Sequence, residues 1–351
     1  MSGKHKVSSV LYALLASVLF GASIPLAKIL IGNIEPVLLA ALLYLGSGAG
    51  LLITRSLFSF FIKSKDIEAG IKKDDIRWLI GAMISGGILA PILLMVSLKY
   101  TPASTASLLL NYEGVATTFI AALIFGESIG KKIKWAIGLN TVACILLSWN
   151  FNGDWGFSLG AIGILLACML WGIDNNLTRH ISAKDPGVIV IIKSIGAGLT
   201  SLLLSVLAHN QIPGIKIILI TMLLGFACYG VSLIFFIFAM RGLGASRTSA
   251  LFSLAPFMGV ILSFVIFREM PVRMFYFSLP IIIYGTYLIL YEKHIHEHTH
   301  ENIVHEHHHR HDDDHHNHEH SSIKEHSHPH QHEYLVHIHQ HTPDIYHRHS
   351  H

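Results

Sequence analysis

The chain has 351 residues, of which 52% are hydrophobic and 13% carry a charge, and its mean hydropathy is +0.53. Soluble domains usually carry about 25% charged residues, so the composition excludes an ordinary soluble enzyme. Residues 1–293 hold 22 Lys and Arg against 12 Asp and Glu, whereas residues 294–351 hold 3 against 10 and also 23 of the 26 histidines. The basic excess lies in short loops between apolar runs, which argues against nucleic-acid binding.

The apolar runs are long enough to cross a bilayer, since a spanning helix needs about 20 apolar residues at a rise of about 1.5 Å each. The sequence predicts an all-α integral membrane protein with ten transmembrane helices, at 8–31, 36–54, 78–98, 103–125, 132–149, 158–180, 187–208, 215–240, 245–267 and 274–291. The first run contains Pro25 and Lys28 and lacks a small-residue cleavage site, so we expect it to be a membrane helix and not a signal peptide.

The Lys and Arg residues of the loops predict the orientation. One set of alternate loops holds 15 of them and the other set holds 4. Cytoplasmic loops carry the excess of positive charge, so we expect both termini to be cytoplasmic in a multi-pass protein of the plasma (inner) membrane.

The body of the chain repeats itself. FGASIPLAKIL (20–30) matches WGIDNNLTRHI (171–181), and SLKYTPASTASLLL (97–110) matches FAMRGLGASRTSALF (238–252). The second match continues into the next helix, where IFGE (124–127) corresponds to IFRE (266–269). Each unit, 8–149 and 158–291, thus has five predicted helices, and an odd number of spans forces the second unit into the opposite orientation. Inverted repeats of this kind are typical of secondary transporters, whose substrate site lies between the halves.

These features resemble the drug/metabolite transporter superfamily, EamA type. The resemblance rests on the paired five-helix units, the aromatic-Gly…Lys/Arg start of each, and the Ala-rich turn before a helix ending in Phe-x-Glu, and it covers about residues 8–291. It implies a ten-helix permease, most often an exporter of small metabolites, amino acids or drugs. Family helices at 103–125 and 245–267 usually carry a proline in mid-helix. Pro256 keeps it in the second unit, whereas the first unit has Gly114 there, preceded by Glu113.

Ionisable residues inside the spans are the candidate substrate and coupling site. A charge at the bilayer centre costs at least about 2.5–3.5 kcal/mol, so it needs a partner, a cavity or a function. Glu113 lies near the middle of its span, where it is either a protonatable carboxylate lining a cavity or a hydrogen-bonded group joining two helices. Asp174 and Lys193 lie at similar depths on neighbouring antiparallel helices, so we expect an ion pair, structural or responsive to substrate.

Three neighbours of Asp174 complete this site. Asn175 and Asn176 are polar residues in a membrane segment and suggest a cavity wall, and Trp171 is either a platform for an organic substrate or part of the core. Four further residues are candidates for gates or helix breaks: Pro25 and Pro256 as helix breaks or neutral kinks, and Glu127 and Glu269 as pairing partners or topological anchors at helix ends.

The segment 294–351 is predicted to be a disordered, metal-binding tail, because it has few apolar residues to bury. Imidazole is a good ligand for Zn, Ni and Co, which makes these cations the expected partners of the tail, although dense histidine is also typical of a pH-sensitive segment. The candidate ligands are His294, His296, His298, His300, His307, His308, His309, His311, His315, His316, His318 and His320.

The sequence therefore predicts a secondary-active transporter, with the lipid bilayer and a small-molecule substrate as partners and no cofactor required. It would work by alternating access and export a small metabolite, with a tail that binds divalent transition metals. The alternatives are an exporter of Ni, Co or Zn and a membrane-tethered metal store. An enzyme is disfavoured because the chain shows no nucleotide loop, nucleophile elbow or paired catalytic carboxylates.

Overall fold

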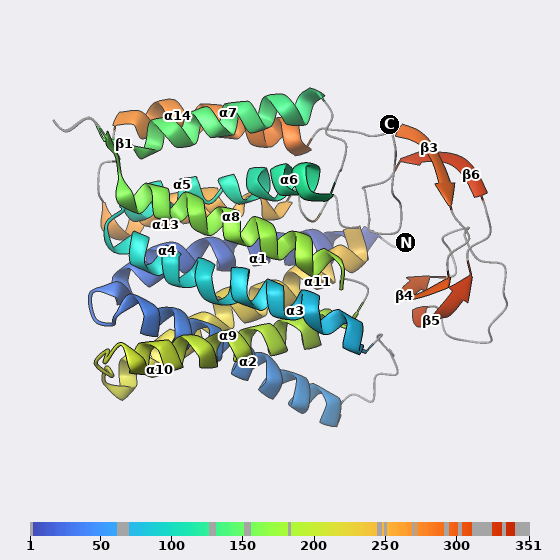
Figure 1. Ribbon diagram of the computed structural model, residues 1–351, viewed down its shortest axis with the longest axis horizontal. Coiled ribbons are helices and arrows are strands. Elements are labelled where there is room, and N and C mark those ends of the chain that lie inside the picture. The colour runs from blue at the N-terminus through green and yellow to red at the C-terminus, as the bar shows by residue number, and fades with distance from the viewer. Residues whose placement is uncertain are drawn as a thin grey trace.

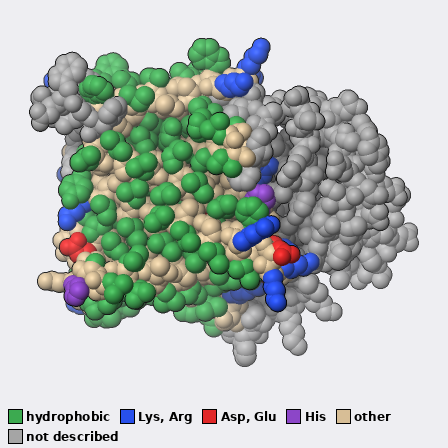
Figure 2. Space-filling view, in the orientation of Figure 1, with side chains coloured by type: hydrophobic (Ala, Val, Ile, Leu, Met, Phe, Trp, Pro, Cys, Tyr) green, Lys and Arg blue, Asp and Glu red, His purple; other side chains and the backbone are tan. Residues whose placement is uncertain are grey.

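Long helices lie side by side in the computed structural model of the protein (Figure 1). The structure describes residues 3–61, 70–125, 131–150, 156–181, 184–243, 248, 251–268, 271, 273–290, 295–300, 304–310, 325–331 and 335–340. Hydrophobic side chains cover most of the face seen in Figure 2, and charged side chains lie towards the ends of the helices. Leu123 is 69% exposed and Val265 67% exposed. A surface of this kind suits lipid and would be costly in water.

The two halves of the bundle have the same order of helices. The first half contains α1 (Gly3–Ile31), α2 (Pro36–Phe61), the 3-10 turn η1 (Lys73–Asp75), α3 (Ile76–Ala82), the π-helical η2 (Met83–Leu89), α4 (Ala90–Lys99), α5 (Ala103–Leu109), α6 (Tyr112–Phe125) and α7 (Lys131–Ser148). The second contains α8 (Leu159–Arg179), α9 (Pro186–Leu207), α10 (Ile215–Gly225), the π-helical η3 (Phe226–Val231), α11 (Ser232–Leu243), α13 (Ala255–Phe267) and α14 (Arg273–Leu290). Between them, β1 (Trp149–Asn150) pairs antiparallel with β2 (Gly156–Phe157).

Seven helices of the described part are long and apolar enough to cross a membrane: Ser8–Ile31, Pro36–Leu57, Lys73–Lys99, Ala103–Ile124, Leu159–Arg179, Gly187–Leu207 and Ile215–Ala239. The other three predicted spans also contain helix, as the shorter apolar helices Lys134–Ser148 and Ala255–Phe267 and as α14. The chain is thus a multi-pass helical membrane protein. That the chain crosses the membrane ten times stays a prediction.

The third helix of each half passes through a π-helical turn at an equivalent position. η2 and η3 correspond at a separation of 142 residues, the same offset that aligns the sequence repeats. At the end of each turn the backbone bonds run one residue further back than in an α-helix: Ala90 donates to the carbonyl of Ser85, and Ser232 to that of Ala227. Such turns are frequent at functional sites. Nothing in the sequence predicted these two π-helical turns.

The fourth predicted span is interrupted in both halves. α5 ends at Leu109 and α6 begins at Tyr112, and the equivalent turn at residues 253–254 precedes α13. Pro256 lies in the first turn of α13, where a proline is favoured, which agrees with its predicted role at a helix break. The first half is interrupted although Gly114 replaces that proline. There the Asn111 amide donates to the Leu108 carbonyl at 3.1 Å, a local bond that competes with the helical ladder.

Pro25 does not break α1, so of the two roles predicted for it, a helix break or a neutral kink, the helix break is wrong. The helix runs through it to Ile31. Pro25 leaves the carbonyl of Gly21 without its helical donor, but this carbonyl lies directly against α13: a Cβ atom built on Gly259 would be 2.8 Å from it. Close contact with neighbouring helices is what makes a proline tolerable inside a membrane helix.

The halves pack against each other in equivalent ways. α2 lies across α9, with Gly48 against Ile195 and Gly198 against Leu45 at equivalent positions 150 residues apart. α1 packs on α11 and α13 of the other half, and α8 packs correspondingly on α4 and α6. Small residues permit these close approaches. Close packing matters here because lipid supplies no hydrophobic force between helices, so their association depends on van der Waals contact. The first helix of each half therefore packs mainly against the opposite half.

The tail contains short strands where disorder was predicted for the whole of 294–351. β3 (Ile295–His300) pairs antiparallel with β6 (Leu335–Gln340), and β4 (Val304–Arg310) pairs with β5 (Glu325–Gln331). The physical reason is visible in the sequence: His-x-His alternation has the period of an extended strand, even where too few apolar residues are present to form a core.

Candidate functional site

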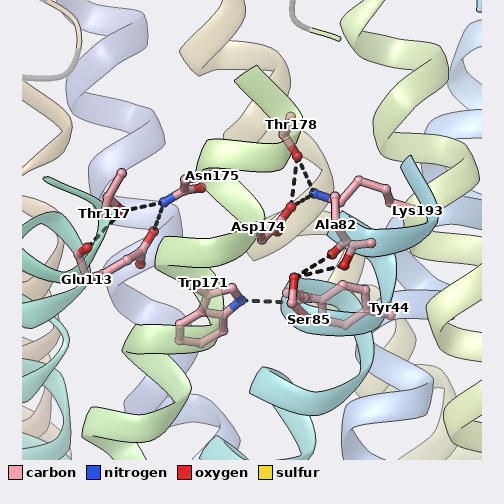
Figure 3. Close-up of polar contacts among 12 residues, drawn as sticks. Tyr44, Ala82, Ser85, Glu113, Thr117, Trp171, Asp174, Asn175, Thr178 and Lys193 are labelled. Atoms are coloured by element: carbon pink, nitrogen blue, oxygen red, sulfur yellow. Dashed lines mark hydrogen bonds and ion pairs between the residues drawn. The ribbon is translucent and has the colours of Figure 1, made fainter. Parts of the chain in front are cut away.

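Four residues on one face of α8 form the centre of the candidate site. Trp171, Asp174, Asn175 and Thr178 are spaced at i, i+3, i+4 and i+7, which places them on one face of the helix. In Figure 3, Glu113 and Thr117 lie on one side of this helix and Lys193 on the other. α8 thus connects two groups of polar side chains.

The first group is the ion pair that the sequence predicted. The ammonium of Lys193 on α9 lies 2.5 Å from Oδ1 of Asp174, whose residue is only 7% exposed. The Thr178 hydroxyl donates to the same carboxylate oxygen at 2.8 Å and accepts from Lys193 at 3.1 Å. The hydrogen bonds among these three side chains offset the cost of removing the two charges from water.

Gly86 in η2 lets this pair lie close to the first half. A Cβ atom at Gly86 would be 1.9 Å from Oδ2 of Asp174, a distance that no real side chain tolerates. Any other residue at position 86 would separate α8 from η2. The contact between Asp174 and Gly86 is therefore a contact between the two halves.

The carbonyl of Gly86 also accepts two hydrogen bonds from other helices. In the π register, which Ala90 follows, this carbonyl would pair with the N–H of residue 91, but that residue is Pro91 and has none. Instead, Trp171 Nε1 on α8 and the Tyr44 hydroxyl on α2 each donate to it at 3.0 Å. Because Pro91 has no N–H, the Gly86 carbonyl is free to accept from both side chains, and it thus joins α2, η2 and α8.

The second group surrounds Glu113, at the midpoint of the span Ala103–Ile124. Glu113 lies in the first turn of α6, directly after the interruption, and is half-buried. The amide of Asn175, an exposed residue of α8, donates to Oε1 of Glu113 at 3.0 Å and to the Thr117 hydroxyl at 3.1 Å. A carboxylate of the first half is thereby bonded to the second half, at the N-terminus of a half-helix where the backbone dipole favours negative charge.

Asn176 and Trp171 have buried positions beside these groups. The Asn176 amide donates to the carbonyls of Thr117 and Gly172, at 3.0 and 2.8 Å, and so joins α8 to α6. Trp171 is 9% exposed and belongs to the main apolar core. Asn176 therefore joins two helices by a hydrogen bond and Trp171 packs in the core, and of the two predicted asparagines it is Asn175 that meets Glu113.

Loop residues hold the helices together at the end predicted to be cytoplasmic. Arg55 of α2 pairs with Asp185 at 2.7 Å, and Asp185 also accepts from the N–H of Val188 at the start of α9. Asp75 pairs with Lys184 at 3.6 Å. Partial burial acts to raise the pKa of Asp185, but the bonds from Arg55 and the helix N-terminus together hold that pKa below its ordinary value.

The sequence profile of the EamA-like transporter family matches the chain twice, over residues 7–149 and 158–291. The chain belongs to the EamA-like transporter family. An uncharacterized transporter of Methanothermobacter thermautotrophicus is 27% identical over 268 residues, covering 72% of this chain and 78% of that relative. A crystal structure of a protein covers 80% of this chain and 95% of its own with a TM-score of 0.58 and 19% identity, a likeness in fold alone.

The family assignment confirms the resemblance inferred from the repeats, and it makes this protein a membrane transporter. The structure does not describe some of the site residues predicted for this EamA-like transporter. Glu127, Glu269, His294, His311, His315, His316, His318 and His320 lie outside the described residues. His296, His298 and His300 lie on β3, and His307, His308 and His309 on β4.

Lys28 of this EamA-like transporter lies against the end of a neighbouring helix. Its ammonium donates to the backbone carbonyls of Leu98, Lys99 and Thr101, at the C-terminal end of α4. Cations are favoured there because the last carbonyls of a helix lack internal donors. Lys28 therefore joins α1 to α4.

Sequence reasoning missed Tyr44, Thr117 and Thr178. Two of them had a usable signal: Thr117 follows Glu113 by four residues, and Thr178 follows Asp174 by four, so each lies one helical turn from its carboxylate. Tyr44 had none, because its role depends on a carbonyl freed by Pro91. Among the side chains that the structure describes there is no group of three or more His, Cys, Asp or Glu suited to a metal ion.

Proposed function

We propose that the protein is a secondary-active exporter of a small metabolite in the plasma (inner) membrane. Two inverted five-helix halves alternate access to a site around α8, and Glu113 is the group that exchanges a proton or cation. Both termini are cytoplasmic, as the 15 to 4 distribution of loop Lys and Arg supports. The family assignment supports transport, while direction and coupling are the finer part of the proposal.

The contact between Glu113 and Asn175 is the observation that carries this proposal. Asp174 and Lys193 neutralise each other, whereas Glu113 is bonded to an uncharged amide and is half-exposed at mid-span. A carboxyl group in such a place can hold a proton in one state and release it in another. Because its bond crosses between the halves, a change in its charge acts directly on their packing.

Glu113→Gln tests the proposal, because glutamine keeps the size and hydrogen-bonding capacity of the side chain but cannot ionise. The matched control is Thr118→Val on the same helix, since the half-buried Thr118 bonds only the carbonyl of Gly114 among the contacts of the described residues. Mass spectrometry of the medium from cells expressing each variant should show solutes exported by wild type and Thr118→Val and not by Glu113→Gln. Undiminished export by Glu113→Gln would remove Glu113 from the mechanism.

The tail supports a second role, the binding of divalent metal as a cytoplasmic buffer or sensor that modulates the transporter. It also supports the competing function of a Ni, Co or Zn exporter, in which the tail delivers the cation to the bundle. Cellular metal content separates these roles in cells with full-length protein, protein ending at Glu292, or Glu113→Gln. Loss of one metal from cells with full-length protein alone favours metal export, and an effect that needs the tail but not Glu113 favours the buffer.

A further inference from the structure

The start of the third helix in the first half is bound to the second half, at the end of the bundle predicted to be cytoplasmic. The ring of Trp78 on α3 stacks on that of His180, which follows α8, with the centroids 4.1 Å apart and an interplanar angle of 12°. Three residues earlier, Asp75 pairs with Lys184 through atoms 3.6 Å apart. These four residues, called the clasp below, join the two halves through side chains near the ends of their helices.

The equivalent positions at the other end of the bundle are packed differently. At the offsets of 142 and 151 residues that align the repeats, Ile220 corresponds to Trp78 and Ile29 to His180. Ile220 is 56% exposed and Ile29 is 46% exposed, whereas the rings of Trp78 and His180 cover each other. The two ends of the bundle therefore differ, although the sequences that form them are repeats.

The packing of whole helices shows the same difference between the ends. In the second half, α3 packs mainly on α8 and touches α9 little. Its equivalent α10 packs mainly on α2, the counterpart of α9, and touches α1, the counterpart of α8, only little. The start of the third helix thus has two different packing arrangements within one molecule, one in each half.

A π-helical turn joins each of these helix starts to the rest of its span. η2 lies between α3 and α4, and η3 lies between α10 and α11. Beyond the turns the two halves are packed alike, because α4 lies on α8 and α11 lies on α1. A π turn interrupts the regular hydrogen-bond ladder and is a common place for a helix to bend. η2 and η3 are therefore the points at which a helix start can change its packing while the remainder of the span stays in place.

The inverted repeat indicates what the second arrangement of α3 would be. Because the halves are inverted copies of one structure, a second state follows when each half takes the arrangement of the other. In that state α3 lies on α9 and leaves α8, so the stack of Trp78 on His180 and the pair of Asp75 with Lys184 are both broken. A single aromatic stack and a single ion pair near the surface are weak interactions, which suits contacts that must form and break in every cycle.

We propose that the clasp is the cytoplasmic gate of the transporter. It closes the path between the cytoplasm and the region of Glu113 and Asn175, and it opens when α3 moves from α8 to α9 about the hinge at η2. The proposal rests on the alternating access proposed above. The helix α8 connects gate and site directly, because Asn175 lies five residues before His180, about 7.5 Å along the helix axis.

Labelling of a cysteine at position 175 tests the proposal without knowledge of the transported solute. Asn175 is exposed and bonded to Glu113, whereas the native Cys144, Cys168 and Cys228 are buried and should not react. A membrane-impermeant maleimide reaches Asn175→Cys protein from the cytoplasmic side in inverted membrane vesicles and from the opposite side in right-side-out vesicles. The rates of labelling in the two preparations measure access to the site from each side.

Trp78→Leu, added to the reporter protein, removes the stack and keeps an apolar side chain. Labelling from the cytoplasmic side should become about two- to tenfold faster, the factor that corresponds to the loss of one aromatic pair, and labelling from the opposite side should not. Trp78→Phe keeps a ring for the stack and should be labelled as the parent is. The matched control is Ile220→Ala at the equivalent position of the other end, which should leave the cytoplasmic rate unchanged.

Reversal of the ion pair gives a second test, which a general loosening of the fold would fail. Asp75→Lys places two cations side by side and should also speed labelling from the cytoplasmic side. Asp75→Lys/Lys184→Asp restores the attraction and should return the rate towards that of the parent. Unchanged rates in Trp78→Leu and Asp75→Lys, equal acceleration from both sides, or a position 175 that is labelled from neither side would overturn the proposal. Export by Glu113→Gln is measured separately, so failure of the gate and failure of the proposed coupling are distinguishable.

Discussion

The first helices of the two halves, α1 and α8, occupy equivalent places and carry different chemistry. At a separation of 151 residues, Phe20, Ser23, Ile24 and Ala27 of α1 correspond to Trp171, Asp174, Asn175 and Thr178 of α8. Around α1 the contacts are aromatic, with the ring of Phe20 5.8 Å from Tyr229 and 5.3 Å from Phe252. Around α8 they are ionic and hydrogen-bonded.

This difference shows that the fold depends on the similarity of the two halves, whereas the polar site does not. Glycines, π-helical turns and interruptions recur in both halves because each half must pack against the other in the same way. Among the described residues, Glu113 and the pair of Asp174 and Lys193 surround α8, whereas the rings of Tyr229 and Phe252 surround the equivalent part of α1. Exchanging residues between equivalent positions is therefore the most direct way to test the comparison.

The largest effect is expected for Lys193→Leu, which places on α9 the residue of the equivalent position on α2, Leu43. Asp174 would then keep a buried charge without its partner, a loss of about 3–5 kcal/mol. Thermal unfolding in detergent measures this. The double variant Asp174→Ser/Lys193→Leu reproduces the uncharged pair of the first half, Ser23 and Leu43, and should recover most of the loss; additive losses would show that the pair does not interact.

A smaller loss is expected for Gly86→Cys, which introduces the residue of the equivalent position in η3, Cys228. Its Cβ would collide with Asp174, and overpacking of this kind costs about 1–3 kcal/mol. Gly138→Ala is the matched control, because nothing lies within 4 Å of a Cβ built there. Unfolding midpoints of the two variants in detergent should differ clearly, and equal midpoints would contradict the close approach of η2 and α8.

Asn175→Ile gives α8 the residue of α1, Ile24, and removes the donor to Glu113. A single hydrogen bond between membrane helices contributes about 0.6 kcal/mol, which corresponds to about a threefold change. We expect transport to fall by about this factor while the protein keeps its fold, because position 175 is exposed. Initial export rates measure the effect against Thr118→Val, and an unchanged rate would mean that Glu113 works without Asn175.

The smallest effect concerns Arg55 and Asp185, outside the spans. Because the pKa of Asp185 is lowered by folding, its contribution is present above the unfolded pKa and is lost as pH falls through the folded pKa. Arg55→Ala should lower the free energy of unfolding by about 0.5 kcal/mol or less at neutral pH, since the Arg55 side chain is 49% exposed. The difference from wild type should vanish in acid, and a difference independent of pH would exclude the carboxylate as its cause.

Hydropathy and repetition predicted most of the helices, because an apolar run of about 20 residues is sufficient to define a membrane helix. The ion pair of Asp174 and Lys193 followed from their equal depth on adjacent helices. The partner of Glu113 did not, since Asn175 is 62 residues away and only packing brings α6 to α8. The sequence did not predict the π-helical turns either, because tertiary contacts decide whether a carbonyl accepts from the N–H four or five residues further along the chain.

The hydrogen bond that Trp171 makes to the carbonyl of Gly86 allows the packing of the bundle to be followed by tryptophan fluorescence. The indole of Trp171 shares this acceptor with the hydroxyl of Tyr44, and the three groups belong to α8, η2 and α2. Sliding of α8 past η2 stretches or breaks the indole bond, and the emission wavelength of an indole follows its hydrogen bonding. With the other four tryptophans replaced by phenylalanine, the protein carries its own fluorescent gauge of the relative position of its two halves, without an attached dye.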